Sequence, residues 1–135
     1  MIYKDKVPYK TEIFPLYIAS GWNERLNLNP DELEKAIQNS FAVVSVYEND
    51  ELIGFGRVVS DGVAYATIYD VMVTPIWQNQ GIGSAIVRIL VQKCERHDIR
   101  RIHLFAAKGA ENFYRHLGFI ARPSDSPGMV YEKVG

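Results

Sequence analysis

The architecture of this chain can be worked out from one stretch, Val71-Met72-Val73-Thr74-Pro75-Ile76-Trp77-Gln78-Asn79-Gln80-Gly81-Ile82-Gly83-Ser84. A short apolar run stops at a proline, a polar turn with two glycines follows, and a segment with helical apolar spacing begins directly after it. This order predicts a strand, a tight loop and the N-terminus of a helix. Such a loop either binds an anion with its backbone N–H groups or is an ordinary strand-to-helix connection.

Upstream of this stretch the apolar period is two. Residues 41–47, 51–59 and 63–73 read as strands, and the polar turns 48–50 and 60–62 separate them. Three consecutive strands with short turns predict an antiparallel meander.

Downstream, the helix that begins near Gly81 carries its apolar side chains on one broad face. Residues 101–107 read as the next strand, which we expect to lie parallel to the third strand of the meander because a helix connects them. A two-turn helix over residues 110–117 should end at Gly118. A strand is expected to begin at Phe119-Ile120, and a final strand is expected at residues 129–132 after a loop from Pro123 to Gly128.

The first forty residues predict a short strand within 2–9, a helix from Thr11 to Gly21 that contains Pro15, and a second helix from Pro30 to about Asn39. Asn29 is a good cap for this second helix, and Pro30 suits its first position. The whole chain therefore reads as one α/β domain, residues 1–135, with a mixed sheet and three to four helices.

The composition excludes several classes of protein. The net charge of −1 provides no basic field for nucleic acid or anionic lipid. The single cysteine, Cys94, cannot form an intrachain disulfide and fits a reducing compartment. No signal-like or membrane-length apolar run is present in the sequence, so we expect a soluble cytoplasmic protein.

Two motifs occur in a fixed order. The first is Gln78-x-x-Gly81-x-Gly83, preceded by Val73-x-Pro75, and the second is Asn112-Phe113-Tyr114-x-x-x-Gly118-Phe119. Over roughly residues 41–132 the chain resembles the GNAT superfamily of N-acetyltransferases, whose pyrophosphate loop and second signature these motifs match. The resemblance implies a GNAT-like fold with splayed central strands and acetyl-CoA as co-substrate.

The resemblance also implies which residues bind the donor. Pyrophosphate needs N–H donors at a helix start, and glycine leaves it room to approach. The pantetheine arm should add beside the strand at the backbones of Val71 and Val73, and an N–H of Val71 or Met72 would polarise the thioester. Asn112 matches a position that hydrogen-bonds this arm. The candidate pyrophosphate donors are Gln78, Asn79, Gln80, Gly81, Ile82, Gly83 and Ser84.

Tyr114 matches the family position that often protonates the sulfur of CoA, against the alternative of a structural tyrosine half-buried on its helix. A primary amine has a pKa of roughly 10, so a proton acceptor is also needed. Some relatives carry Glu or His where this chain has Thr67 and Tyr69. Asp70 should alternate to the face opposite Tyr69 and Val71. We therefore expect deprotonation through water or by an unidentified residue.

The acceptor side carries fewer signals. The segment between the first two helices commonly borders the acceptor pocket in this family, which makes Glu24 a candidate. The first helix should flank the acceptor side, which makes Trp22 and Tyr17 candidates, and Tyr69 is a further one. Phe113, Phe119 and Cys94 read as core residues. The histidines show no metal-ligand spacing with Cys94, so no metal site is expected.

Two functions from different classes remain open. The first is N-acetylation of a primary amine, on a small molecule or a peptide, by direct attack without a covalent enzyme intermediate. The second is a sensor of the same fold that binds an acyl-CoA without turnover. The missing base favours the sensor, and Tyr114 favours catalysis. An ATP loop would have lysine after its second glycine, where this chain has Ser84. Members of the family are often dimers, and the oligomeric state of this chain stays open.

Overall fold

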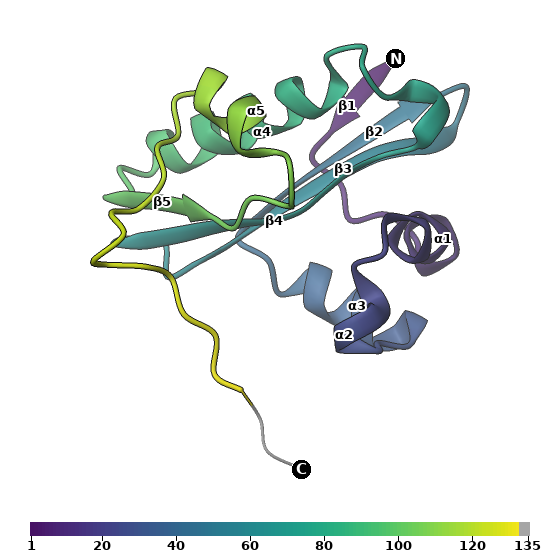
Figure 1. Cartoon of the computed structure of the whole chain (residues 1–135). Helices are drawn as coiled ribbons and strands as arrows, with labels where there is room; N and C mark the ends of the chain where they lie inside the picture. The colour runs from purple at the N-terminus through teal and green to yellow at the C-terminus, as the bar shows by residue number, and fades with distance from the viewer. Residues whose placement is uncertain (133–135) are drawn as a thin grey trace. The chain divides into compact units, whose positions relative to one another are not determined.

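The computed structural model describes residues 1–132 of the chain (Figure 1). These residues form two compact units, Met1–Phe105 and a second one that begins at Ala106. The first unit contains the whole sheet and four of the α-helices in the described chain.

The sheet has five strands in the order β1-β2-β3-β4-β5. Strands β1 to β4 pair antiparallel, and β5 lies parallel to β4, which confirms the predicted mixed sheet. β5 ends three residues earlier than predicted. The strands span Ile2–Lys4 (β1), Ala42–Glu48 (β2), Glu51–Ser60 (β3), Tyr65–Val73 (β4) and Arg101–Leu104 (β5).

The helices begin and end at residues suited to these positions. Helix α1 (Lys10–Ser20) ends at Gly21, which has a left-handed φ of 82°. The side chain of Asn29 accepts a hydrogen bond from the amide of Glu32, and the Glu32 carboxylate accepts one from the amide of Asn29, so a capping box opens α3 (Pro30–Gln38). The four-residue helix α2 (Asn23–Leu26) was not predicted, because it is too short to show apolar periodicity.

Helices cover both faces of the sheet in the first unit (Figure 1). Helices α1 and α3 pack on one face over a core that includes Phe55 and Met72. Helix α4 (Ile82–Arg96) packs on the other face with Ile86, Leu90 and Cys94 buried. Gly54 and Gly56 of β3 lie under α4, where an added Cβ at Gly56 would be 2.6 Å from Cγ2 of Ile86. The central strand β3 is thus buried between two helical layers, and β4, which leads into the predicted loop, is only partly buried beside it.

The second unit contains α5 (Glu111–His116), and Gly118 follows with a φ of 96°. The predictions of a strand that begins at Phe119 and of a strand over residues 129–132 are wrong, since neither segment pairs in a sheet. The first apolar run is short and is followed by Pro123, and Pro127 interrupts the segment before the second run. Met129, Val130 and Tyr131 are 83 to 87% exposed, so they have no packed partner.

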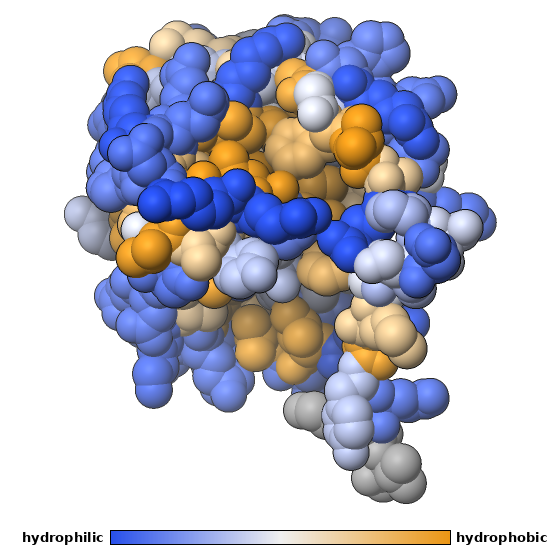
Figure 2. Space-filling view, turned by 90° about the vertical axis from the view of Figure 1, so that its left-hand side faces the viewer, coloured by the Kyte–Doolittle hydropathy of each residue, from blue (hydrophilic) through white to orange (hydrophobic). Residues whose placement is uncertain are grey.

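Apolar side chains also reach the surface of the described chain. Val63, Tyr65 and Phe105 are among the exposed ones in the first unit. Figure 2 shows orange residues framed by hydrophilic ones on the face that it draws. None of the helices in the described part of the chain is both long and apolar enough to cross a membrane.

We predict that Gly56→Ala destabilises the protein by about 1–3 kcal/mol, because the new methyl group would overlap Ile86 and Leu90. Urea unfolding measures this change in the free energy of unfolding. The matched control is Gly54→Ala on the same strand and face, where the nearest atom is the flexible Cδ1 of Ile86 at 3.2 Å. Equal stability of the two variants would contradict the close approach of α4 to β3 at Gly56.

Candidate functional site

Strand β4 carries a bulge where it pairs with β3. Phe55 lies opposite Met72 and Arg57 lies opposite Tyr69, so Gly56 faces two residues of β4, Asp70 and Val71. Asp70 has a left-handed φ of 57°. A bulge of this kind breaks the strict alternation of side chains along a strand.

Because of this bulge, the side chain of Asp70 does not have the predicted orientation. The Nε of Arg57 donates to Oδ2 of Asp70 at 2.6 Å, and the Cζ of Arg57 lies 5.7 Å from the ring centre of Tyr69. Asp70 and Tyr69 are therefore on the same face of the sheet, the face of α3. Val71 is on the opposite face, because its Cγ2 lies 3.7 Å from a Cβ built at Gly56, beside Ile86 of α4. The prediction that Asp70 faces away from Tyr69 was wrong because it assumed regular alternation.

The outer edge of β4 is open beyond Ile68 within the first unit. Parallel pairing with β5 runs from Tyr65 to Ile68 and stops at Leu104. At the end of the strand the amide of Thr74 donates to the carbonyl of Ile53 at 2.8 Å and so points toward β3. Since backbone groups alternate between the two edges, those of Val73 and Val71 point to the open edge, and those of Met72 point toward β3. This edge has the geometry that an extended, amide-containing ligand requires.

The loop after β4 folds back on itself and then opens α4. A short 3-10 helix over Pro75–Trp77 follows β4, and both Asn79 and Gly81 have left-handed φ values, of 63° and 83°. The first helical hydrogen bond of α4 runs from Ala85 to the carbonyl of Gly81, and no side chain caps the helix. The amides of Ile82, Gly83 and Ser84 therefore have no acceptor within α4.

Gly81 allows a left-handed turn and leaves open space beside the backbone. Its φ of 83° strains any residue that has a Cβ, and a Cβ built there meets no atom within 4 Å. The space in front of the helix N-terminus is therefore open, and the helix dipole favours negative charge there. The loop residues fit a phosphate group on this ground.

Gln78 donates hydrogen bonds within the chain, unlike the loop amides described above. Its side-chain Nε2 donates to the carbonyl of Val73 at 2.9 Å, and its backbone amide donates to the carbonyl of Pro75 at 3.2 Å. Its backbone amide and one N–H of its side-chain amide are thus used inside the chain, so the predicted anion contacts depend mainly on the amides from Asn79 to Ser84. The side chain of Gln78 ties the loop to the end of β4.

A cleft of about 200 Å³ lies between the end of α1 and β4. Trp22 is among the residues that line it, whereas Tyr17 is buried in the core and does not line it. The residues that line the cleft include no carboxylate. They are Leu16, Ala19, Ser20, Trp22, Val71, Met72, Val73, Pro75 and Gln78.

The other two acceptor-side candidates lie away from this cleft lining. Tyr69 is 38% exposed and stacks on Phe105 with ring centres 6.4 Å apart. Glu24 is exposed on α2. Neither position supplies a base held against the open edge of β4.

The second unit holds the residues of the second motif. Tyr114 is half-buried on α5, and its ring makes edge contacts with Phe113 at 4.9 Å and Phe119 at 6.0 Å. Burial raises the pKa of the Tyr114 phenol above its ordinary value of 10.0, so the phenol keeps its proton at neutral pH. Asn112 is exposed on the same helix. Phe113 is 38% exposed, which corrects the prediction that it is a core residue.

No group of residues in the described part of the chain has the composition and proximity to hold a metal ion. Cys94 is fully buried, and burial raises the pKa of its thiol. A buried thiol of this kind is a core residue and a poor nucleophile.

Sequence reasoning missed Arg57. The available signal was a single cation inside the otherwise apolar run from Leu52 to Val59, which requires a partner if it is buried. The partner Asp70 could not be assigned, because the bulge that turns it toward Arg57 has no glycine to mark it.

The family model described as an acetyltransferase (GNAT) domain matches residues 15–128. An uncharacterized N-acetyltransferase, ycf52, from Pyropia yezoensis is 32% identical, with 97% of this chain and 85% of that protein covered. The chloroplastic GCN5-related N-acetyltransferase 2 of Arabidopsis thaliana is 43% identical over 82% of this chain and 50% of its own length. The histone acetyltransferase TAP1 of Glycine max is 37% identical over 82% and 52%.

Solved structures agree with this match. A Staphylococcus aureus protein described as a probable acetyltransferase has a TM-score of 0.86 and 27% identity, with 98% of each chain covered. A GNAT family acetyltransferase from Streptococcus pneumoniae has a TM-score of 0.83 and 26% identity, with 98% of this chain and 97% of that one covered. The chain spans about half the length of several curated relatives that it matches.

We predict that Gly81→Glu abolishes binding of CoA, because the substitution puts bulk and negative charge in the open space before α4. Isothermal titration calorimetry with CoA measures the loss. Gly62→Glu is the matched control, since Gly62 has the same left-handed conformation, with a φ of 81°, in a turn remote from the loop. Retained affinity in the Gly81 variant, or equal loss in both variants, would contradict the assignment of the loop.

Proposed function

The chain belongs to the GNAT family of acetyltransferases, and on this basis we propose that it transfers the acetyl group of acetyl-CoA to a primary amine. The observation that carries the proposal is the joint geometry of the open edge of β4 and the uncapped N-terminus of α4. One offers an extended row of amides and carbonyls, and the other offers N–H groups without acceptors, which together suit a ligand with a pantetheine arm and a pyrophosphate.

Specific residues would hold acetyl-CoA, which supplies an acyl group activated as a thioester. The amides from Asn79 to Ser84 would bind the pyrophosphate, and the backbones of Val71 and Val73 would pair with the pantetheine arm. The outward amide of Val71 is also the candidate donor to the thioester oxygen, in preference to Met72, whose backbone groups point toward β3. Asn112 is proposed as a further donor to the arm from α5.

Tyr114 is the proposed general acid. In the overall reaction a bond forms between the amine nitrogen and the acetyl carbon, and the bond from that carbon to sulfur breaks. The amine loses one proton, and the thiolate gains one. Because the Tyr114 phenol is protonated at neutral pH, it can give that proton to the sulfur. For the proton of the amine we propose transfer through water, because the residues that line the cleft beside Val71 and Val73 include no carboxylate.

The same missing carboxylate supports a second candidate, a protein of this fold that binds an acyl-CoA without turnover. The two candidates differ in one respect, whether a thiol is released when an amine is present. A bound acyl-CoA with no thiol release would identify the sensor.

The acceptor class follows from the relatives only as a proposal. One relative is named as a histone acetyltransferase, and others are named N-acetyltransferases without a stated acceptor. Both lysine-containing peptides and small amines are therefore proposed as acceptors. Trp22 lines the cleft beside β4 and is the side chain that we propose to contact the acceptor there. Tyr69 and Glu24 are proposed to contact parts of the acceptor outside this cleft. A homodimer in the cytoplasm is the form that we propose for the working protein.

The deciding experiment measures free thiol released from acetyl-CoA with a panel of acceptors. The panel contains small amines, polyamines, arylalkylamines, lysine peptides and peptide N-termini. The acetyltransferase predicts thiol release with at least one acceptor, together with the acetylated amine in the mass spectrum. Calorimetric binding of acetyl-CoA without thiol release across the whole panel would favour the sensor instead.

We predict that Tyr114→Phe lowers kcat by about 100-fold, in line with loss of a general acid, and leaves the affinity for CoA nearly unchanged. Steady-state kinetics and calorimetry measure the two quantities. The control is Tyr131→Phe, which removes the hydroxyl of an exposed tyrosine in the same unit and should leave kcat unchanged. An unchanged kcat for Tyr114→Phe would remove Tyr114 from the mechanism.

The pH dependence of kcat gives an independent test of Tyr114. Since burial raises the pKa of the phenol above 10.0, the acid form persists at neutral and mildly alkaline pH and is lost only above pH 10.0. At saturating amine we therefore expect that deprotonation of Tyr114 does not lower kcat between about pH 7 and about pH 9. A fall of kcat in that range which Tyr114→Phe abolishes would contradict the raised pKa.

A further inference from the structure

We propose that Arg57 and Asp70 are positioning residues that hold the bulge of β4 in the form that turns the backbone of Val71 to the open edge. This inference rests on the proposed function, because it concerns the strand that would bind the acyl donor. Neither residue belongs to either of the two motifs.

The two side chains form a short ion pair in a mostly buried setting. The Nε of Arg57 lies 2.6 Å from Oδ2 of Asp70, and the side chains are 15% and 10% exposed. Charges at this depth are screened little by solvent, and removal of one partner leaves the other as an unpaired buried charge. The pair therefore constrains the two strands more strongly than a surface ion pair does.

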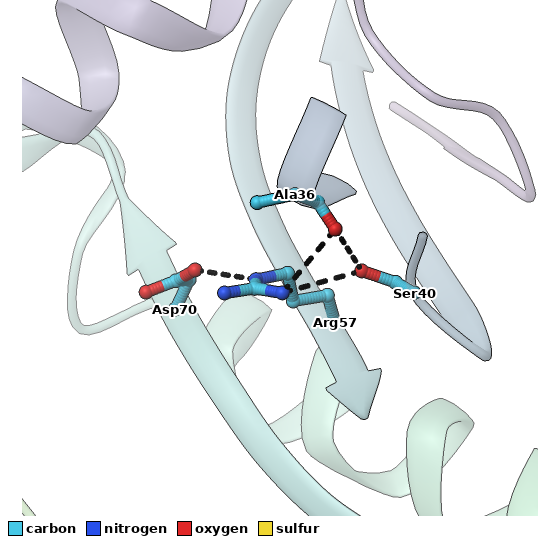
Figure 3. A network of polar contacts seen from close by, with 4 residues as sticks. All are labelled: Ala36, Ser40, Arg57 and Asp70. Atoms are coloured by element: carbon cyan, nitrogen blue, oxygen red, sulfur yellow. Dashed lines mark hydrogen bonds and ion pairs between the residues drawn. The ribbon is translucent and has the colours of Figure 1, made fainter. Parts of the chain in front are cut away.

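Arg57 also ties the bulge to a helix (Figure 3). Its Nη1 donates to the carbonyl of Ala36 in α3 at 3.5 Å and to Oγ of Ser40 at 3.4 Å. The ring of Tyr69 lies against the same guanidinium, 5.7 Å from Cζ to the ring centre. One side chain of β3 thus holds both Tyr69 and Asp70 on the bulged strand and fixes them relative to α3.

A third element, α1, packs close to the pair. Tyr17 of α1 is buried, and its pKa is raised first by burial and second by the negative charge of Asp70, while Arg57 lowers it. The hydroxyl of Tyr17 is therefore within electrostatic reach of both partners. Helix α1 also packs, with α3, on the face of β3 and β4 to which Phe55 and Met72 belong.

The position of the bulge decides which amides face the open edge. Without it, Gly56 would pair with a single residue of β4, and each residue beyond would shift by one place. Because strand geometry has a period of two, this shift would exchange the outward amides of Val71 and Val73 for those of their neighbours. Asp70 can adopt the left-handed conformation without glycine, and its bond to Arg57 stabilises that conformation over a regular strand.

The test uses four variants of the full chain. Asp70→Gly keeps the left-handed backbone and removes the ion pair, and Asp70→Asn keeps a hydrogen-bonding oxygen without the charge. Arg57→Gln removes the other partner. The double variant Arg57→Gln/Asp70→Asn restores a neutral pair. The matched control is Lys93→Gln, which breaks the ion pair of Lys93 with Asp5 at 3.0 Å, away from β4.

Three readouts separate positioning from stability: the free energy of unfolding, the kcat for thiol release, and the backbone amide signals of Val71 and Val73 in the protein without ligand. For Asp70→Gly and Arg57→Gln we expect kcat to fall about 10- to 100-fold and both amide signals to move. The double variant should recover part of kcat relative to Arg57→Gln, because it leaves no unpaired charge. Lys93→Gln should keep kcat and both signals.

Two results would overturn the inference. One is a folded Asp70→Gly with kcat within about twofold of wild type and unmoved Val71 and Val73 signals, since loss of positioning predicts a much larger change. The other is a Lys93→Gln variant in which kcat and the free energy of unfolding fall as much as they do in Asp70→Gly. If Asp70→Gly does not fold, Asp70→Asn is judged by the same criteria. A wild-type protein that neither binds CoA nor releases thiol would instead refute the proposed function, while the amide signals would still test the bulge.

Discussion

The geometry of the site depends on a change in hydrogen bonding along one strand. From Ala66 to Ile68, β4 is paired on both edges, and beyond Ile68 its outer edge has no strand partner within the first unit. An exposed row of amides and carbonyls normally attracts another strand. Here the row is short and lies beside the helix-opening loop, so a small extended molecule can take the place of a strand.

The strand and the loop act together because they are linked. The side chain of Gln78 donates to the carbonyl of Val73, the last residue of β4, and Gly81 then turns the chain into α4. In this way the open edge and the uncapped helix N-terminus are only a few residues apart and held in one arrangement. The glutamine brings no charge, so the electrostatic attraction for phosphate comes from the N–H groups and the helix dipole.

Much of the fold and the loop of the candidate site could be predicted from the sequence. Periodicity gave the meander and α4, and the glycines with Pro75 marked the loop, since these features depend on local sequence. The bulge at Asp70 could not be predicted, because it arises from pairing between strands and from an ion pair with Arg57. The two C-terminal strands were overpredicted, because apolar residues such as Met129 and Val130 indicate a strand only when a partner is present.

The acceptor side is less determined by local pattern. Trp22 lines the cleft, whereas Tyr17 is core, and the two could not be distinguished by sequence because both are aromatic residues near the end of α1. The proton acceptor could not be identified from the sequence either, since a base is recognised by its place in the folded site. The cleft beside Val71 and Val73 is lined by apolar and neutral side chains, and its lining therefore does not identify a base.

The central claim is that backbone groups of β4 and the following loop bind the donor. A titration of the isotope-labelled protein with CoA, followed through backbone amide signals, tests it most directly. The largest changes should occur at Val71, Val73 and the amides from Asn79 to Ser84, while the amide of Met72, which points toward β3, should change less. Changes centred elsewhere in the chain, with these amides unmoved at saturation, would contradict the account.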